Sequence, residues 1–153
     1  EWRWGNHTLA GRVAHFVDLL SVAKRSVVII TGSLHHNLFD HDEVVCALEA
    51  LPDDVRVEVF HEDPIDEKSA RFKRELMRRN AEIRRIAPNQ ISHGMIIDSK
   101  HCKVEAFGVP DGQDHKRARY YMFAPRLARR ALDQVEAVIL GHAPAAQEHS
   151  AAA

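Results

Sequence analysis

The sequence predicts an α/β domain whose mixed sheet is flanked by helices on both faces. A continuous β-branched run at 26–32, ended by a glycine, is typical of a strand buried on both faces. Helical and strand-like patterns alternate from residue 8 to residue 86, and a hairpin pattern follows at 93–107. With 153 residues, one domain can bury most of the apolar surface. We expect a single domain over 1–143 and a disordered tail over 144–153.

Each element is predicted from a local pattern of apolar spacing and of residues that end helices and strands. Asn6 or Thr8 can cap the first helix, and Asn80 is expected to end a charged helix that points Phe72 and Met77 inward. The pattern after the last helix is compatible with a final short strand. The expected elements are helices at 8–25, 42–51, 66–80 and 125–140 and strands at 26–32, 55–60, 82–86, 93–97 and 101–107, with polar loops at 34–41 and from 108 onward.

Composition excludes several classes of function. The formal net charge is −1, so no whole-chain field attracts polyanions. No apolar run reaches the roughly 20 residues of a membrane-spanning helix, and no signal-peptide pattern opens the chain. Cys46 and Cys102 lie in apolar patterns and are expected to be buried free thiols, which favours a reducing, cytoplasmic location. The start at Glu1, with Trp2 and Trp4 as either core or interface aromatics, fits a domain of a longer chain or assembly.

The strongest local signal is the hairpin around Asp98, Ser99 and Lys100. With a three-residue turn, one face is apolar and the other carries polar groups, whereas a slip of one residue mixes the two sets. The expected cross-strand pairs are Ile97 with His101, Met95 with Lys103 and His93 with Glu105. The apolar face holds Ile96, Cys102, Val104 and Ala106.

The polar face of this hairpin has the groups that phosphoryl chemistry needs. An imidazole can act as nucleophile or general acid, an ammonium can hold phosphate oxygens, and a carboxylate can orient the imidazole. The alternative is a solvated sheet face on which Lys and Glu pair across strands. The candidate catalytic residues are His93, Lys103, Asp98, Glu105 and His101.

The segment at 9–107 resembles one half of the phospholipase D-like superfamily. The resemblance rests on the first helix, the strands at 27–31 and 55–59, the helix between them, and His93-Gly94-Met95-Ile96-Ile97-Asp98. It implies a phospholipase D-like α/β fold. Active members carry His-x-Lys-x4-Asp and work as two facing halves, and short members with a single motif dimerise.

This chain departs from that motif whether the positions are counted forward from His93 or back from Asp98. Counted forward, His93 takes the nucleophile position, Met95 replaces the lysine and Asp98 comes two residues early. Counted back from Asp98, Ile91 takes the histidine position and His93 the lysine position. His101 begins a second His-x-Lys but lacks the acid. We hypothesise that Lys103 supplies the missing charge from the neighbouring strand.

Two further groups are candidate binding residues. Ser33, His35 and Asn37 follow the first strand at its carboxyl end, where α/β sheets place ligand contacts; with Lys100 they are the expected phosphate-binding residues, the alternative being a polar loop without a ligand. The candidate partner-binding residues, which could equally cover a solvated surface, are Arg78, Arg79, Arg84 and Arg85.

No metal or cofactor is expected. The sequence is rich in histidine, but its histidines come with no paired cysteines and without the spacing of a structural zinc site. The residues considered were His35, His36, His41 and His61.

Three functions are compatible with these observations, and whether the chain is an enzyme is left open. The first is a degenerate phospholipase D-like module that recognises a phosphate or phosphodiester group of a nucleic acid or a phospholipid head group, with catalysis weak or absent. The second is a homodimeric, metal-independent phosphodiesterase or nuclease that works through a phosphohistidine. The third is a non-catalytic adaptor domain in a larger assembly.

Overall fold

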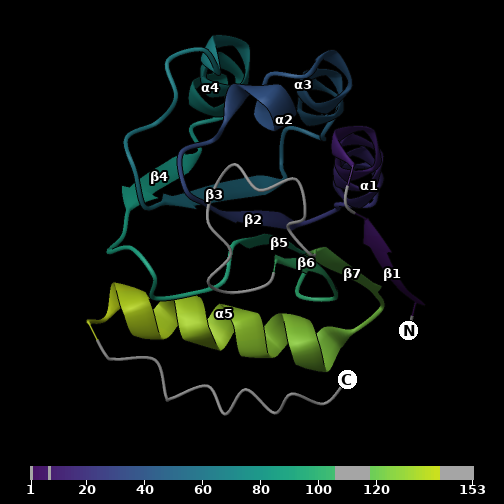
Figure 1. Ribbon diagram of the computed structural model, residues 1–153, viewed down its shortest axis with the longest axis vertical. Helices are drawn as coiled ribbons and strands as arrows, with labels where there is room; N and C mark the ends of the chain where they lie inside the picture. Colours follow the sequence, from purple (N-terminus) through teal and green to yellow (C-terminus); the bar gives the residue numbers. More distant parts are fainter. Residues whose placement is uncertain (1, 7, 106–117, 142–153) are drawn as a thin grey trace.

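The computed structural model describes residues 2–6, 8–105 and 118–141, with side chains from residue 8 to residue 104 and from 119 to 141. Its described elements form one sheet with helices on both faces (Figure 1). The expected tail at 144–153, the loop from 108 and Ala106 lie outside the described residues. The elements are β1 (Trp2–Asn6), α1 (Leu9–Ser21), β2 (Ser26–Thr31), α2 (His36–Phe39), α3 (Asp42–Glu49), β3 (Arg56–His61), α4 (Ala70–Arg78), β4 (Glu82–Arg85), β5 (Gly94–Ile97), β6 (His101–Glu105), β7 (Ala118–Met122) and α5 (Pro125–Ile139).

The sheet has seven strands in the order β1-β7-β6-β5-β2-β3-β4. The strands β2, β3 and β4 are parallel, and the remaining neighbours are antiparallel. Figure 1 shows α1 to α4 on one face and α5 on the other. The predicted mixed sheet with helices on both faces is therefore confirmed.

Strand β2 explains why the first strand pattern is continuously apolar. Val27 and Ile29 belong to the core cluster beneath α1, α3 and α4, whereas Val28 and Ile30 belong to the cluster beneath α5. All four side chains are buried because successive residues of a strand point to opposite faces.

The hairpin has the predicted register. Met95 pairs with Lys103 and Ile97 with His101, and the Lys100 N–H donates to the Ile97 carbonyl at 2.9 Å. The expected alternative of a solvated face is wrong, because α1 and its neighbours cover that face and leave Lys103 3% exposed. The pair of His93 with Glu105 is outside the ladder, since β5 begins at Gly94.

Gly94 is required where the hairpin strands approach each other. A Cβ at this position would lie 2.1 Å from the backbone oxygen of Lys103. Any other residue must therefore push β5 and β6 apart.

Several local predictions are corrected. Met77 is 64% exposed because the buried stripe of α4 passes through Phe72, Glu75 and Leu76 instead. Cys46 is exposed on α3, while Cys102 is buried, and both thiols are free. The expected His-rich loop contains α2, and β1 and β7 extend the sheet at the edge where no strand was predicted.

Other predicted details are confirmed. Thr8 caps α1 through its side chain, and Asn80 follows α4 with a left-handed φ of 53°.

The side chains of Trp2 and Trp4 lie outside the described part of the chain. Among the described helices, none has the length and apolar character needed to cross a bilayer.

Candidate phosphate site at the carboxyl end of the sheet

The two ends of the hairpin β5–β6 lie at opposite ends of the sheet, measured along the direction of the strands. Gly94 pairs with Ile30 near the carboxyl end of β2, and Ile97 pairs with Val27 near its amino end. We call these two ends of the sheet the carboxyl end and the amino end, after the direction of β2. A strand rises about 3.3 Å per residue, so His93 and Asp98 are separated by roughly 16 Å.

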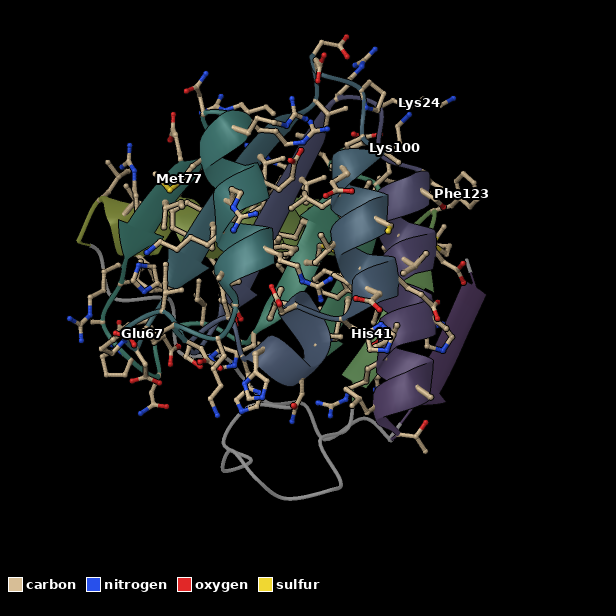
Figure 2. All side chains as sticks on the ribbon, turned by 90° about the horizontal axis from the view of Figure 1, so that it is seen from above. Lys24, His41, Glu67, Met77, Lys100 and Phe123 are labelled. Carbon is tan, nitrogen blue, oxygen red and sulfur yellow. The ribbon has the colours of Figure 1, made fainter. Side chains whose placement is uncertain are left out.

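The five predicted catalytic residues are therefore divided between the two ends. Asp98 and His101 lie at the amino end, whereas His93 precedes β5 at the carboxyl end and Lys103 lies one pair inside it. Glu105 is the last residue of β6, and its side chain is outside the described part. Figure 2 shows the exposed lysines of the amino end, Lys24 and Lys100, opposite His41 and Glu67.

At the amino end, Asp98 is a structural residue of the turn. Its carboxylate accepts from the backbone N–H groups of Lys24, Arg25 and Ser26 at 2.9, 2.7 and 2.8 Å. Partial burial raises the pKa of Asp98, but these three donors outweigh it and hold the pKa below its usual value. Left-handed backbone at Asp98 and Ser99, with φ of 52° and 57°, completes the turn.

His101 is also held by the fold. It is 5% exposed, its Nδ1 accepts from the Phe123 N–H at 3.0 Å, and its ring meets the Phe123 ring at 4.7 Å. Desolvation lowers the pKa of His101, with Asp98 acting in the opposite direction. The imidazole is thus a neutral acceptor that anchors the segment after β7.

At the carboxyl end, His93 meets a carboxylate that the sequence analysis did not single out. Its Nε2 lies 3.3 Å from Oε1 of Glu62, the residue that follows β3, and the Glu62 side chain is 8% exposed. The Glu62 N–H donates to the carbonyls of Thr31 and Gly32, which fixes the segment. The position directly after a buried parallel strand was the signal that could have identified Glu62.

Lys103 is buried on the strand next to β5. Its Nζ lies over the rings of Phe16 and Tyr120, at 5.7 and 5.9 Å from their centroids, which is cation–π geometry. His93 stands two residues before Met95, the partner of Lys103, and such diagonal positions are roughly 7–8 Å apart, within reach of long side chains.

The loop after β2 brings Ser33, His35 and Asn37 to the same end of the sheet. The Asn37 N–H donates to His35 Nδ1 at 3.3 Å, and the Ser33 carbonyl accepts from the Asp66 N–H at 2.8 Å. The backbone and ring N–H groups of His36 hold the pKa of the Asp66 carboxyl well below its usual range. Lys100, the fourth predicted phosphate-binding residue, lies at the amino end and is not brought together with the other three.

The four predicted partner-binding arginines form two pairs. Arg78 and Arg79 both donate to Glu75, at 2.8 and 3.1 Å, and the Arg79 side chain is 2% exposed. The Arg78 hydrogen bond lowers the pKa of Glu75 against the effect of burial. Arg84 and Arg85 are exposed on the edge strand β4, where they line a groove of about 530 Å³ together with the end of α5.

Comparison with solved structures shows that this fold is phospholipase D-like. Nuc from Salmonella typhimurium, a phospholipase D family member, matches with a TM-score of 0.61 and 13% identity, over 83% of this chain and 86% of that chain. NucT from Helicobacter pylori matches with a TM-score of 0.59 and 8% identity, over 94% of this chain and 100% of that chain.

A third similar structure is the DNA-binding archaeal chromatin protein TrmBL2. Its TM-score is 0.59 at 10% identity, over 95% of this chain and 55% of that chain. At such identities the likeness concerns the fold alone. No protein-family model matches this sequence, and no curated protein does.

Proposed function

We propose that this chain binds a phosphate or phosphodiester group at the carboxyl end of its sheet and does not turn it over. The observation that carries the absence of turnover is the burial of Ile91. Counted back from Asp98, Ile91 takes the position of the nucleophilic histidine, and it is only 3% exposed, within the apolar cluster beneath α5. An aliphatic side chain has no lone pair with which to attack phosphorus.

The groups around His93 support binding. In this counting His93 takes the lysine position, where an imidazole can still donate to an oxyanion. Lys103 adds an ammonium from the adjacent strand, fixed over two aromatic rings. A phosphodiester oxygen can accept hydrogen bonds from an ammonium and from an imidazole N–H, so both side chains are suitable donors.

Turnover and binding are tested separately. With bis(p-nitrophenyl) phosphate and EDTA, the wild-type protein is expected to release no nitrophenol above a protein-free control. Isothermal titration with a thymidine dinucleotide, inorganic phosphate and a short-chain phosphatidylglycerol then measures binding and separates a nucleic-acid source of the phosphodiester from a lipid one. Absence of binding to all three probes would overturn the proposal.

A homodimeric phosphodiesterase is a second candidate, and the contact between His93 and Glu62 favours it. A carboxylate beside Nε2 can orient an imidazole, which leaves Nδ1 as the atom that would attack phosphorus. The same assay discriminates, with light scattering to give the oligomeric state. Turnover by a dimer that disappears in His93→Ala would establish this candidate and refute the binding-only proposal.

A further inference from the structure

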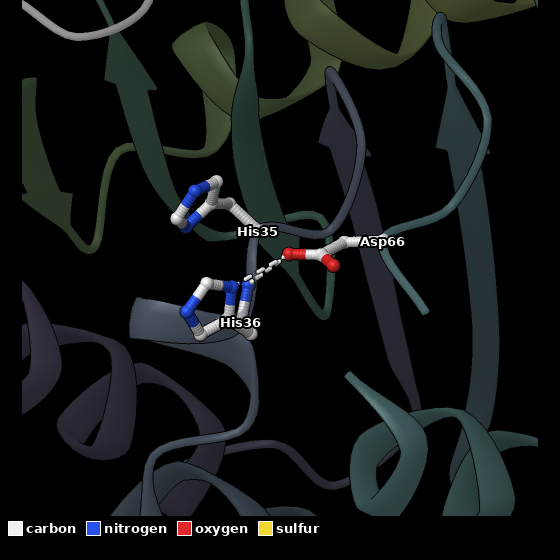
Figure 3. A group of neighbouring side chains, drawn as sticks. All are labelled: His35, His36 and Asp66. Atoms are coloured by element: carbon white, nitrogen blue, oxygen red, sulfur yellow. Dashed lines mark hydrogen bonds and ion pairs between the residues drawn. The ribbon is translucent and has the colours of Figure 1, made fainter. Parts of the chain in front are cut away.

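We infer a binding site for a divalent transition metal of the zinc class in the loops that follow β2 and β3. The site consists of His35, His36 and Asp66, which we call the His35 cluster (Figure 3). One ligand atom from each residue lies within 4.8 Å of the other two. Within the described residues, this is the one group of three His, Cys, Asp or Glu side chains close enough to share an ion.

The donor set selects the class of metal. Two imidazoles and one carboxylate are ligands that Zn²⁺ and its neighbours accept, whereas Ca²⁺ and Mg²⁺ prefer oxygen ligands. Three protein ligands leave the fourth tetrahedral position to water. Ligand atoms around zinc are roughly 3.3 Å apart. The exposed ring of His35 can move to meet this distance, and the 2.7 Å contact between His36 Nδ1 and Asp66 Oδ2 must lengthen for both of these atoms to be ligands.

The backbone that carries the three residues is already fixed. The Asp66 N–H donates to the Ser33 carbonyl at 2.8 Å, and the His36 N–H donates to Asp66 Oδ2 at 3.0 Å. Lys68 N–H donates to the other carboxylate oxygen at 3.0 Å. These bonds join two loops that are thirty residues apart in sequence, so little chain entropy remains to be lost when an ion binds.

The arrangement of these three residues can also be explained without a metal. The His36 Nδ1 lies 2.7 Å from Asp66 Oδ2 as an ordinary ion pair, and His35 would serve only as the cap of α2. The metal site and the metal-free explanation differ in the role that they give to His35. Its capping role is shared by His41, whose Nδ1 accepts from the Glu43 N–H at 3.3 Å, the same distance as in the bond from Asn37 to His35. His41 is therefore a matched control.

This inference does not rest on the proposed function. Sequence spacing could not supply it, because the third ligand comes from a separate loop. Its consequence would be a Lewis acid, with an exchangeable water, at the end of the sheet where β2 and β3 finish.

The experiment is a Zn²⁺ titration of the full chain in competition with a chromophoric chelator, at neutral pH and without phosphate. His35→Ala and Asp66→Asn are each expected to weaken Zn²⁺ binding at least ten-fold, whereas His41→Ala stays within two-fold of wild type. Replacing Zn²⁺ by Co²⁺ gives a second readout, since four-coordinate Co²⁺ absorbs strongly in the visible range and this absorption should disappear in His35→Ala.

Circular dichroism of each variant establishes that it is folded. Should Asp66→Asn fail to fold, His35→Ala still decides, because its side chain is exposed. Equal Zn²⁺ affinity in wild type, His35→Ala and His41→Ala would overturn the inference, as would the absence of Zn²⁺ binding by the wild-type chain.

Discussion

The two ends of the hairpin β5–β6 use similar residue types for opposite purposes. At the amino end, the Asp98 carboxylate is occupied by three backbone N–H groups and the His101 ring accepts from Phe123. At the carboxyl end, His93 and Glu62 contact each other through their side chains, with Lys103 on the adjacent strand. Polar groups that bond to backbone hold a fold together, whereas groups that face one another can be shared with a ligand.

The largest effect is expected from Asp98→Ala. The substitution leaves three backbone donors without their charged acceptor, which should lower the free energy of unfolding by about 3 kcal/mol. Urea unfolding followed by circular dichroism measures it. The control is Asp54→Ala, an exposed acid in the turn before β3, expected to change stability by less than about 0.5 kcal/mol. Equal stability of both variants would show that Asp98 is not a structural residue.

Gly94→Ala should act next most strongly, now at the carboxyl end. Its Cβ would lie 2.1 Å from a backbone oxygen of β6, so the strands must separate at a cost of about 2 kcal/mol. Gly141→Ala is the comparison, because nothing lies within 4 Å of that Cβ and only its φ of 73° opposes the change, at about 1 kcal/mol. If Gly94→Ala were the milder of the two in urea unfolding, the close approach of β5 and β6 would be refuted.

A matched pair of lysine variants tests the comparison through binding. Lys103→Met keeps the aliphatic stem among Phe16 and Tyr120 but removes the ammonium, and should weaken binding of the thymidine dinucleotide about ten-fold, or about 1.4 kcal/mol. Lys100→Met removes the same charge from the exposed turn at the amino end and should change affinity less than two-fold. Isothermal titration of both variants decides, and a larger loss in Lys100→Met would reverse the assignment of the two ends.

The smallest effect is the acid dependence of stability contributed by Asp98. The pKa of Asp98 in the folded protein is below its pKa in the unfolded chain, which is about 3.9. The stability that Asp98 contributes is therefore present above a pH of about 3.9 and is lost as the pH falls toward the folded pKa. Urea unfolding between pH 6 and pH 3 should show a shallower loss for Asp98→Asn than for wild type. Parallel curves for the two proteins would contradict this role.

Local patterns were sufficient for much of the fold. The continuous apolar run of β2 and the alternation on both sides of Asp98 gave the central strand and the hairpin register, because each depends only on which face a residue occupies. Met77 and Cys46 were misplaced because adjacent residues of a helix point about 100° apart, and the sequence alone did not show which side would be covered.

The candidate site depends on distant parts of the chain and was only partly predictable. His93 and Lys103 were identified from the hairpin, but Glu62 and Asp66 reach the same end of the sheet from loops after other elements. The burial of Lys103 follows from α1 packing over it, which no strand pattern reveals. Ile91 was visible as a departure from the motif, while its burial beneath α5 needed the structure.

The central claim is that phosphate binds at the carboxyl end of the hairpin. Its most direct test is a ¹H–¹⁵N NMR titration of the wild-type chain with the thymidine dinucleotide, following the backbone amides of both ends. The account predicts saturable shifts at His93, Gly94 and Lys103 and almost none at Ser99 and Lys100. Shifts confined to Ser99 and Lys100, or no saturable shift at either end, would contradict it.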